Sequence, residues 1–161
     1  MQTTGSVVLR ELFSPARIEL NLQSNDRESL LAELVNHIPE LAGLPEERQT
    51  LLRALREREQ LHSTGIGDGV ALPHSRNALV GLVDHSLIVF GRHVNGIPFD
   101  AIDAAPARLF FLVVAPTVTQ HLAILARLSR LLADPKLRQG LLGAQTPREV
   151  MQRIADAEST L

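Results

Sequence analysis

The spacing of apolar residues along the chain predicts helices that alternate with short strands. In several stretches, leucine and other apolar residues recur every three or four positions, which is the period of a helix with one buried side. The predicted helices cover about residues 26–38, 45–60, 119–132, 134–143 and 147–157. Asn25 or Asp26 can cap the first of them, and the run from Thr146 to Glu149 has a capping-box pattern before the last.

Four shorter segments either alternate between polar and apolar residues or are rich in Val, Ile and Phe, as strands are. These predicted strands cover residues 17–20, 70–72, 86–91 and 109–115. Because helices occur between and around the strands, we expect an α/β (α+β) fold in which helices cover a sheet. Residues 1–6 are expected to form a flexible tail, and residues 7–157 a single domain.

Composition narrows the class of protein. The chain has 161 residues, 45% of them hydrophobic, which is enough for one domain with a substantial core. Its net charge of −2 and its few aromatic residues argue against a nucleic-acid surface. Without cysteine, disulfides and thiolate chemistry are excluded. The N-terminal residues lack a signal-peptide pattern and the apolar stretch 109–116 is too short to span a bilayer, so we expect a soluble, cytoplasmic protein without membrane insertion.

The segment from Ser63 to Arg76 is the most informative part of the sequence. Three alternate glycines let the backbone bend where side chains would obstruct it, and a short apolar run then leads to Pro73 and His74. Proline fixes its own φ and favours an extended residue before it, so the imidazole is expected at a rigid strand end. Backbone N–H groups near such a turn can face an anion. His74 is therefore a candidate phosphoryl acceptor.

Four segments, in this order and spacing, are similar to the IIA components of the bacterial phosphotransferase system. The chain resembles the fructose–mannitol class of that family, and within it the nitrogen-regulatory enzyme IIA. The resemblance covers about residues 9–154 and is carried by Arg58-Glu59, by Ser63-Thr64-Gly65-Ile66-Gly67 with Leu72-Pro73-His74, by Pro98-Phe99-Asp100-Ala101-Ile102-Asp103 and by His121-Leu122. It implies a single domain with a mixed sheet of about five strands covered by helices.

The resemblance also implies the chemistry, which is phosphoryl transfer through a phosphohistidine on Nε2 of His74. His121 matches the family's second histidine and Arg58 its site arginine, so both are expected to stabilise the phosphoryl group. The expected phosphate-site loop contains Thr64, Gly65 and Gly67. The implied donor is a small carrier protein of the HPr or NPr type, and in the sugar branch the acceptor is a IIB domain. No metal or cofactor is implied, because both partners in the transfer are histidines.

The chain departs from the family pattern at two positions. Ser75 stands where glycine often follows the active histidine, and Ala104 stands where glycine often follows the aspartate of the middle motif. The aspartates of that motif, Asp100 and Asp103, are interpreted as loop-ordering residues rather than an acid–base pair.

Three functions fit these residues. The first is a phosphocarrier of the phosphoenolpyruvate-dependent system that regulates nitrogen or other metabolism through its phosphorylation state. The second is the IIA subunit of a fructose- or mannitol-type sugar transporter, which passes phosphate to a IIB domain. The third is a non-catalytic binding module that retains the fold. The pair His74 and His121 favours phosphotransfer, and the lack of a visible IIB or IIC region favours the regulatory role.

Overall fold

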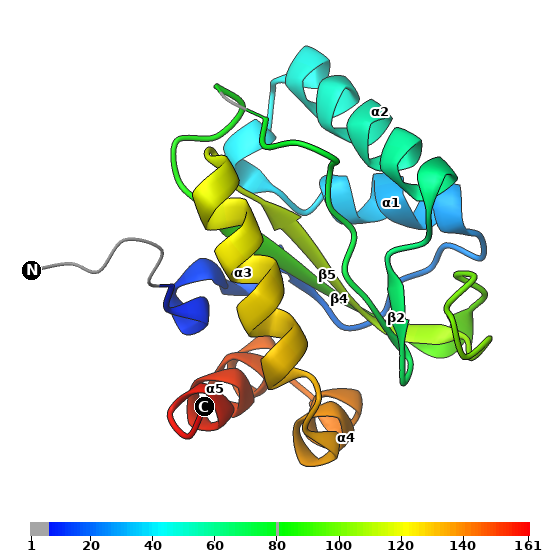
Figure 1. The fold of residues 1–161 in the computed structure, drawn as a ribbon, viewed down its shortest axis with the longest axis vertical. Helices are drawn as coiled ribbons and strands as arrows, with labels where there is room; N and C mark the ends of the chain where they lie inside the picture. Colours follow the sequence, from blue (N-terminus) through cyan, green and yellow to red (C-terminus); the bar gives the residue numbers. More distant parts are fainter. Residues whose placement is uncertain (1–6, 80) are drawn as a thin grey trace, which may run out of the picture.

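The computed structural model describes residues 7–79 and 81–161, so the tail expected at residues 1–6 lies outside the described residues. The described chain combines one sheet with α-helices and short 3-10 helices (Figure 1). The strands are β1 (Ile18–Glu19), β2 (Gly65–Gly67), β3 (Val70–Ala71), β4 (Leu87–Ile97) and β5 (Ala107–Val114). The α-helices are α1 (Arg27–Val35), α2 (Pro45–Leu61), α3 (Val118–Leu131), α4 (Pro135–Gly143) and α5 (Pro147–Glu158). The 3-10 helices are η1 (Leu9–Leu12), η2 (Pro15–Arg17) and η3 (Pro39–Leu41).

The strands form a single mixed sheet in the order β1-β4-β5-β3-β2, which confirms the expected five-stranded fold. At its centre β4 and β5 pair antiparallel, in a register that sets Leu87 opposite Val114. β1 lies parallel to β4, and β3 lies parallel to β5. β2 returns antiparallel to β3 at the edge.

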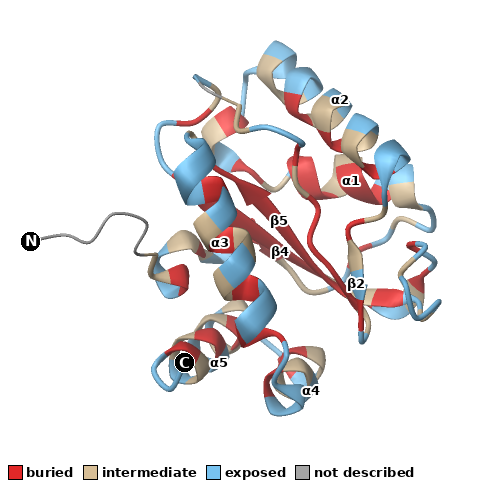
Figure 2. Ribbon diagram, in the orientation of Figure 1, coloured by how far each residue is buried: buried red, intermediate tan, exposed pale blue. Residues whose placement is uncertain are grey.

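Helices cover both faces of the sheet, with α1 and α2 on one side and α3, α4 and α5 on the other (Figures 1 and 2). Alternate side chains of the central strands therefore enter two separate cores. Ile88 and Phe111 belong to the core that α3 to α5 close, whereas Val89 and Phe110 belong to the core that α1 and α2 close. Burial on both faces explains why these strands are almost continuously apolar.

Glycine at position 91 lets α1 approach the sheet closely. A Cβ atom on Gly91 would lie 2.7 Å from side-chain atoms of both Leu22 and Leu34, well inside ordinary carbon–carbon contact. The central strand β4 therefore needs a glycine here if the core under α1 is to close without a gap.

Most predicted elements are confirmed, with differences at their ends. α1 ends at Val35, before the predicted end at residue 38, because the chain turns there toward Pro39, which cannot continue the helix. β4 continues past residue 91 to Ile97, since Arg92 still pairs with a residue of β5. β2 was not predicted, because the sequence pattern of residues 65–67 indicates a glycine-rich turn, and only pairing with β3 makes it a strand.

Side-chain caps mark where α1 and α5 begin. Asp26, rather than Asn25, caps α1 by accepting a backbone N–H from its first turn, and Thr146 does the same for α5. The predicted capping box at α5 forms only in part, because Glu149 bonds the N–H of Gln145 at 3.0 Å rather than that of the cap residue.

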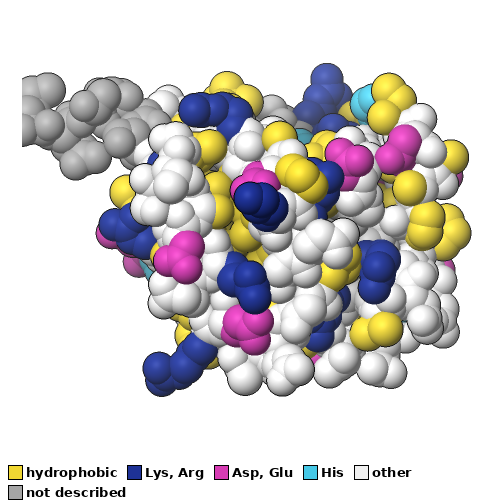
Figure 3. Space-filling view, turned by 90° about the horizontal axis from the view of Figure 1, so that it is seen from below, with side chains coloured by type: hydrophobic (Ala, Val, Ile, Leu, Met, Phe, Trp, Pro, Cys, Tyr) yellow, Lys and Arg dark blue, Asp and Glu magenta, His cyan; other side chains and the backbone are white. Residues whose placement is uncertain are grey.

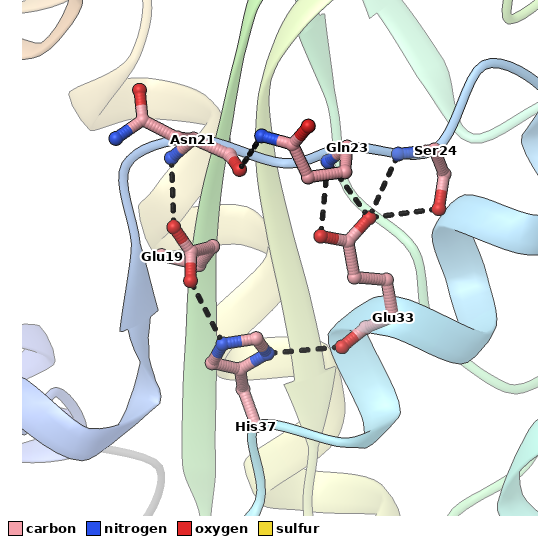
Figure 4. Close-up of polar contacts among 6 residues, drawn as sticks. All are labelled: Glu19, Asn21, Gln23, Ser24, Glu33 and His37. Atoms are coloured by element: carbon pink, nitrogen blue, oxygen red, sulfur yellow. Dashed lines mark hydrogen bonds and ion pairs between the residues drawn. The ribbon is translucent and has the colours of Figure 1, made fainter.

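Polar contacts tie the connection between β1 and α1 to the helix (Figure 4). The carboxylate of Glu33 accepts the N–H groups of Gln23 and Ser24, each at 3.0 Å. His37 lies between the carboxylate of Glu19, 3.1 Å from Nε2, and the backbone oxygen of Glu33, 3.0 Å from Nδ1. Both ring nitrogens of His37 therefore lie within hydrogen-bond distance of oxygen atoms, and the side chain links β1 to α1.

Charged side chains of both signs are intermixed on the face seen in Figure 3, so that face carries no basic patch. Across residues 7–79 and 81–161, no helix has the length and apolar character needed to cross a membrane.

Candidate active site

The segment that carries His74 is anchored between two parts of the sheet. Before it, the Leu72 N–H donates to the backbone oxygen of Thr64 at 2.9 Å, which extends the pairing of β2 with β3. After β3 the chain continues along β5, where the Val113 N–H donates to the backbone oxygen of Pro73 at 2.9 Å and His74 forms a bridge to Val113. The backbone of His74 is thus fixed at a strand end.

One hydrogen bond decides which ring nitrogen of His74 is available. Nδ1 lies 2.7 Å from the backbone oxygen of Leu72. A carbonyl oxygen can only accept, so Nδ1 carries the hydrogen and the lone pair of the neutral ring is left on Nε2. Burial lowers the pKa of His74 against the opposing effect of the Leu72 bond, and the positive charge of Arg58, with that of His121 whenever its ring is protonated, lowers it further. At neutral pH the ring is therefore neutral, with a nucleophilic Nε2.

α3 brings His121 beside His74. Thr117 caps this helix by accepting the N–H of Gln120 at 3.2 Å, so that α3 begins at Val118 and His121 completes its first turn. The two imidazole centroids are 5.4 Å apart, and the ring planes meet at 63°. His121 is only 5% exposed, and this burial lowers its pKa. Two neutral imidazoles therefore share one corner of the fold.

Arg58 lies in the last turn of α2 and is half-buried. Its guanidinium donates to the backbone oxygen of His62, which closes the C-terminal end of the helix. Its charge lowers the pKa of His74, and its side chain lines the same cleft as Ser75, the residue that follows His74. His62 itself is exposed.

The segment expected to form the phosphate-site loop is built differently in the structure. Gly65 and Gly67 lie within β2 rather than in a loop. Thr64 is 3% exposed, and its hydroxyl donates to the carboxylate of Glu59, which also accepts the Thr64 N–H at 3.1 Å. The Thr64 hydroxyl is therefore committed to a buried carboxylate and is not presented to an anion beside His74. The assignment of this segment to a phosphate site stays a prediction.

Glu59 is a buried carboxylate to which the sequence patterns assigned no role, although it is part of the Arg58-Glu59 segment that carries the family resemblance. It lies in a run of alternating charges, which is typical of a solvated helix face, yet it is 6% exposed. A signal was present, because Glu59 continues the four-residue spacing of Leu51 and Leu55 on the buried side of α2. Burial raises the pKa of Glu59, and the hydrogen bonds from Thr64 oppose that rise.

Asp100 and Asp103 order the loop between β4 and β5, in agreement with the interpretation from sequence. The Asp103 carboxylate accepts the N–H groups of Asp68 at 2.9 Å and Ala105 at 3.0 Å, and these two bonds lower its pKa. Asp100 pairs with Arg27 of α1 at 3.2 Å.

The two departures from the family pattern have different backbone geometries. Ser75 is buried, its hydroxyl donates to the backbone oxygen of Asn77, and its φ is not positive, so the backbone there does not require glycine. Ala104 has a φ of 60°, in the left-handed region that glycine adopts more easily than any other residue.

Replacing Ala104 with glycine is expected to raise the free energy of unfolding by about 1 kcal/mol. Glycine adopts this φ without the clash between Cβ and the following carbonyl, and that gain exceeds its larger entropy in the unfolded chain. Urea denaturation measures the change. Ala105→Gly is the matched control and is expected to destabilise, because its φ is not positive. A lower stability of A104G would contradict strain at this position.

A cleft of about 690 Å³ lies between the end of α2 and the segment that follows His74. Arg58 and Arg76 both line it, together with the polar residues Ser75 and Asn77. In the part of the chain that the structure describes, no group of three or more His, Asp or Glu residues is arranged to hold a metal ion.

Known proteins of different lengths are similar to this chain. The chain is 34% identical over 148 residues to the fructose-specific EIIABC component of the PTS system of Bacillus subtilis. The matched region covers 91% of this chain but only 23% of that relative. The chain is also 31% identical over 155 residues to a nitrogen regulatory protein of Pseudomonas aeruginosa. That matched region covers 94% of this chain and 97% of the relative.

A solved structure and a family match agree with these relatives. The crystal structure of the nitrogen regulatory protein IIA-Ntr from Neisseria meningitidis is 27% identical and matches with a TM-score of 0.79, over 90% of this chain and 97% of that one. Residues 11–157 match the family described as "Phosphoenolpyruvate-dependent sugar phosphotransferase system, EIIA 2". The resemblance seen in the sequence is confirmed, and the chain belongs to this EIIA family of the phosphotransferase system.

Proposed function

We propose that the chain is a histidine phosphocarrier, a phosphotransferase that accepts a phosphoryl group on Nε2 of His74 from an HPr- or NPr-type carrier. The hydrogen bond from Nδ1 of His74 to the Leu72 carbonyl carries this proposal, because it leaves the lone pair on Nε2. Membership of a phosphoenolpyruvate-dependent family supports the source of the phosphoryl group. We also propose a cytoplasmic location, because the proposed donor is a carrier protein of the cytoplasm.

Transfer between two histidines requires in-line positioning and charge stabilisation more than acid–base chemistry. The Nε2 lone pair of His74 forms the new N–P bond while the N–P bond to the donor imidazole breaks and its electron pair returns to the donor nitrogen. No proton has to leave Nε2 first, because the ring hydrogen lies on Nδ1. In this proposal His121 donates an N–H to a phosphoryl oxygen, and Arg58 supplies positive charge.

Regulation of nitrogen or other metabolism is the proposed physiology. It is supported by the similarity to the Pseudomonas nitrogen regulatory protein, which extends over 97% of that protein. The alternative is a IIA subunit of a fructose- or mannitol-type transporter, which the 34% identity to the fructose-specific relative supports. Rapid onward transfer from the phosphorylated chain to a purified IIB domain would favour the transporter role.

The phosphocarrier proposal is tested by incubating the purified chain with phosphoenolpyruvate, enzyme I and an HPr-type carrier. We expect one phosphoryl group per chain, labile in acid and stable in base, as for a phosphoramidate. Intact mass measures the stoichiometry, and NMR of the ¹⁵N-labelled imidazoles identifies the nitrogen. Phosphate on another residue would contradict the site assignment, and no uptake at all would favour the non-catalytic binding module.

Replacing His121 with alanine is expected to slow phosphoryl transfer about a hundredfold without abolishing it, because one donor to the transferred group is lost. His121→Gln keeps an N–H donor and is expected to recover part of the rate. Single-turnover transfer from the phosphorylated carrier measures the effect. The control is Thr119→Ala, an exposed residue in the same turn of α3. If H121A transferred as fast as the control, His121 would have no part in the reaction.

A further inference from the structure

A chain of hydrogen bonds connects the buried Glu59 with the imidazole of His74. The Glu59 carboxylate accepts both the N–H and the hydroxyl of Thr64. The backbone oxygen of Thr64 accepts the Leu72 N–H at 2.9 Å, and the backbone oxygen of Leu72 accepts Nδ1–H of His74 at 2.7 Å. The carboxylate and the imidazole are thus the two ends of one hydrogen-bond chain.

This series of hydrogen bonds holds α2 against the sheet at a point where the polypeptide connection between α2 and β2 is short. α2 ends at Leu61 and β2 begins at Gly65, so only residues 62–64 lie between them. Within that connection Thr64 is the residue held from both sides, by Glu59 of α2 and by Leu72 beyond β3. A shift of Thr64 would therefore be passed to the carbonyl group that holds the His74 ring.

A carboxylate at position 59 has no explanation in packing alone. Leu51 and Leu55 on the same side of α2 are 1% exposed, so an apolar residue would continue their stripe. Burying a carboxylate is costly unless hydrogen bonds compensate it. Both oxygens of Glu59 are compensated by Thr64, and burial still raises the pKa of Glu59. Compared with a leucine, the carboxylate adds two hydrogen bonds that fix the position of Thr64.

We propose that Glu59 is a positioning residue for His74, which acts through Thr64 and Leu72 to hold the imidazole in its Nδ1–H tautomer and keep the Nε2 lone pair free. Glu59 itself does not touch the phosphoryl group. The proposal rests on the proposed function of His74, but the tautomer of the ring can be measured without any phosphoryl transfer.

The test compares Glu59→Ala and Thr64→Val with wild type, with Glu57→Ala, an exposed acidic residue of the same helix, as the matched control. NMR of ¹⁵N-labelled imidazoles measures the His74 tautomer, which is expected to be Nδ1–H in wild type and the control. In both test variants the Nε2–H tautomer is expected to appear. Their transfer rate at saturating carrier is expected to fall about tenfold, because the His74 ring is misplaced. The KM for the carrier is expected to stay within about twofold of the wild-type value, because docking of the carrier is unaffected.

Two conservative variants separate hydrogen bonding from charge and bulk. In Glu59→Gln the amide can accept the Thr64 N–H and donate to its hydroxyl, and Thr64→Ser restores the hydroxyl, so both are expected to keep the wild-type tautomer. If Glu59→Ala does not fold, Thr64→Val carries the test, since valine keeps the shape and backbone N–H of threonine and loses only the hydroxyl.

The outcomes distinguish this proposal from the proposed function. Folded E59A or T64V protein that keeps a pure Nδ1–H tautomer and transfers at the wild-type rate would overturn the positioning role. If the tautomer changes in the variants but wild-type protein takes up no phosphate, the positioning role would be supported and the phosphocarrier function overturned.

Discussion

Replacement of His74 with alanine is expected to abolish phosphoryl uptake while leaving the protein folded. The variant loses the imidazole that carries the free Nε2 lone pair, whereas the backbone bonds at this strand end involve Pro73 and Val113 and do not depend on the ring. We do not expect His121 to replace it, because His121 is only 5% exposed whereas His74 is more open. Intact mass after incubation with phosphoenolpyruvate and the carrier proteins measures the loss.

The matched control for this variant is His62→Ala. His62 is close to His74 in the sequence but exposed, and only its backbone oxygen contacts the site, through Arg58. This control is expected to take up phosphate at close to the wild-type rate. Phosphate uptake by folded H74A protein would show that another residue is the acceptor.

Replacement of Glu158 with alanine is expected to lower the free energy of unfolding by about 3 kcal/mol. This carboxylate at the end of α5 is 4% exposed and closes the N-terminal segment onto the last helix. It accepts the N–H groups of Leu9 at 2.6 Å and Arg10 at 3.0 Å, and Nε of Arg127 at 2.8 Å. Alanine leaves the buried Leu9 N–H without its acceptor. For a chain of this size the loss corresponds to a fall in Tm of roughly 6–12 °C.

The contribution of Glu158 is expected to depend on pH. Burial raises the pKa of this carboxyl, but the hydrogen bonds from Arg127, Leu9 and Arg10 outweigh burial and hold the pKa below its ordinary value. A folded pKa below the unfolded one means that the stabilisation is fully present above the unfolded pKa of about 4.3 and is lost as the pH falls through the folded value.

Urea denaturation of wild type and Glu158→Gln between pH 7 and pH 3 checks this dependence. The difference in stability is expected to be constant above about pH 5 and to shrink below about pH 4.3. Arg127→Ala keeps the two backbone bonds of Glu158 and is expected to lose less than half as much stability as E158A. A difference between wild type and E158Q that stayed constant down to pH 3 would contradict a lowered pKa.

Features that depend on neighbouring residues were predicted from the sequence. Apolar stripes and caps such as Asp26 and Thr146 indicated the helices, because helical bonds and caps join residues a few positions apart. The apolar runs indicated β4 and β5 for a similar reason. β2 was missed, since two of its three residues are glycines and only its pairing with β3 makes it a strand.

In the candidate site too, some features follow from the local sequence and others only from contacts made in the tertiary structure. The sequence by itself indicated the candidate nucleophile, because Pro73 restricts the backbone directly before His74 and the preceding glycines allow the bend that leads to it. It also indicated His121 and Arg58 through family resemblance. Only the tertiary structure decided that Nδ1 of His74 is bonded and Nε2 is free, and that the Thr64 hydroxyl faces a buried Glu59. These choices depend on hydrogen bonds between groups that folding brings together, and such bonds leave no periodic pattern in the chain.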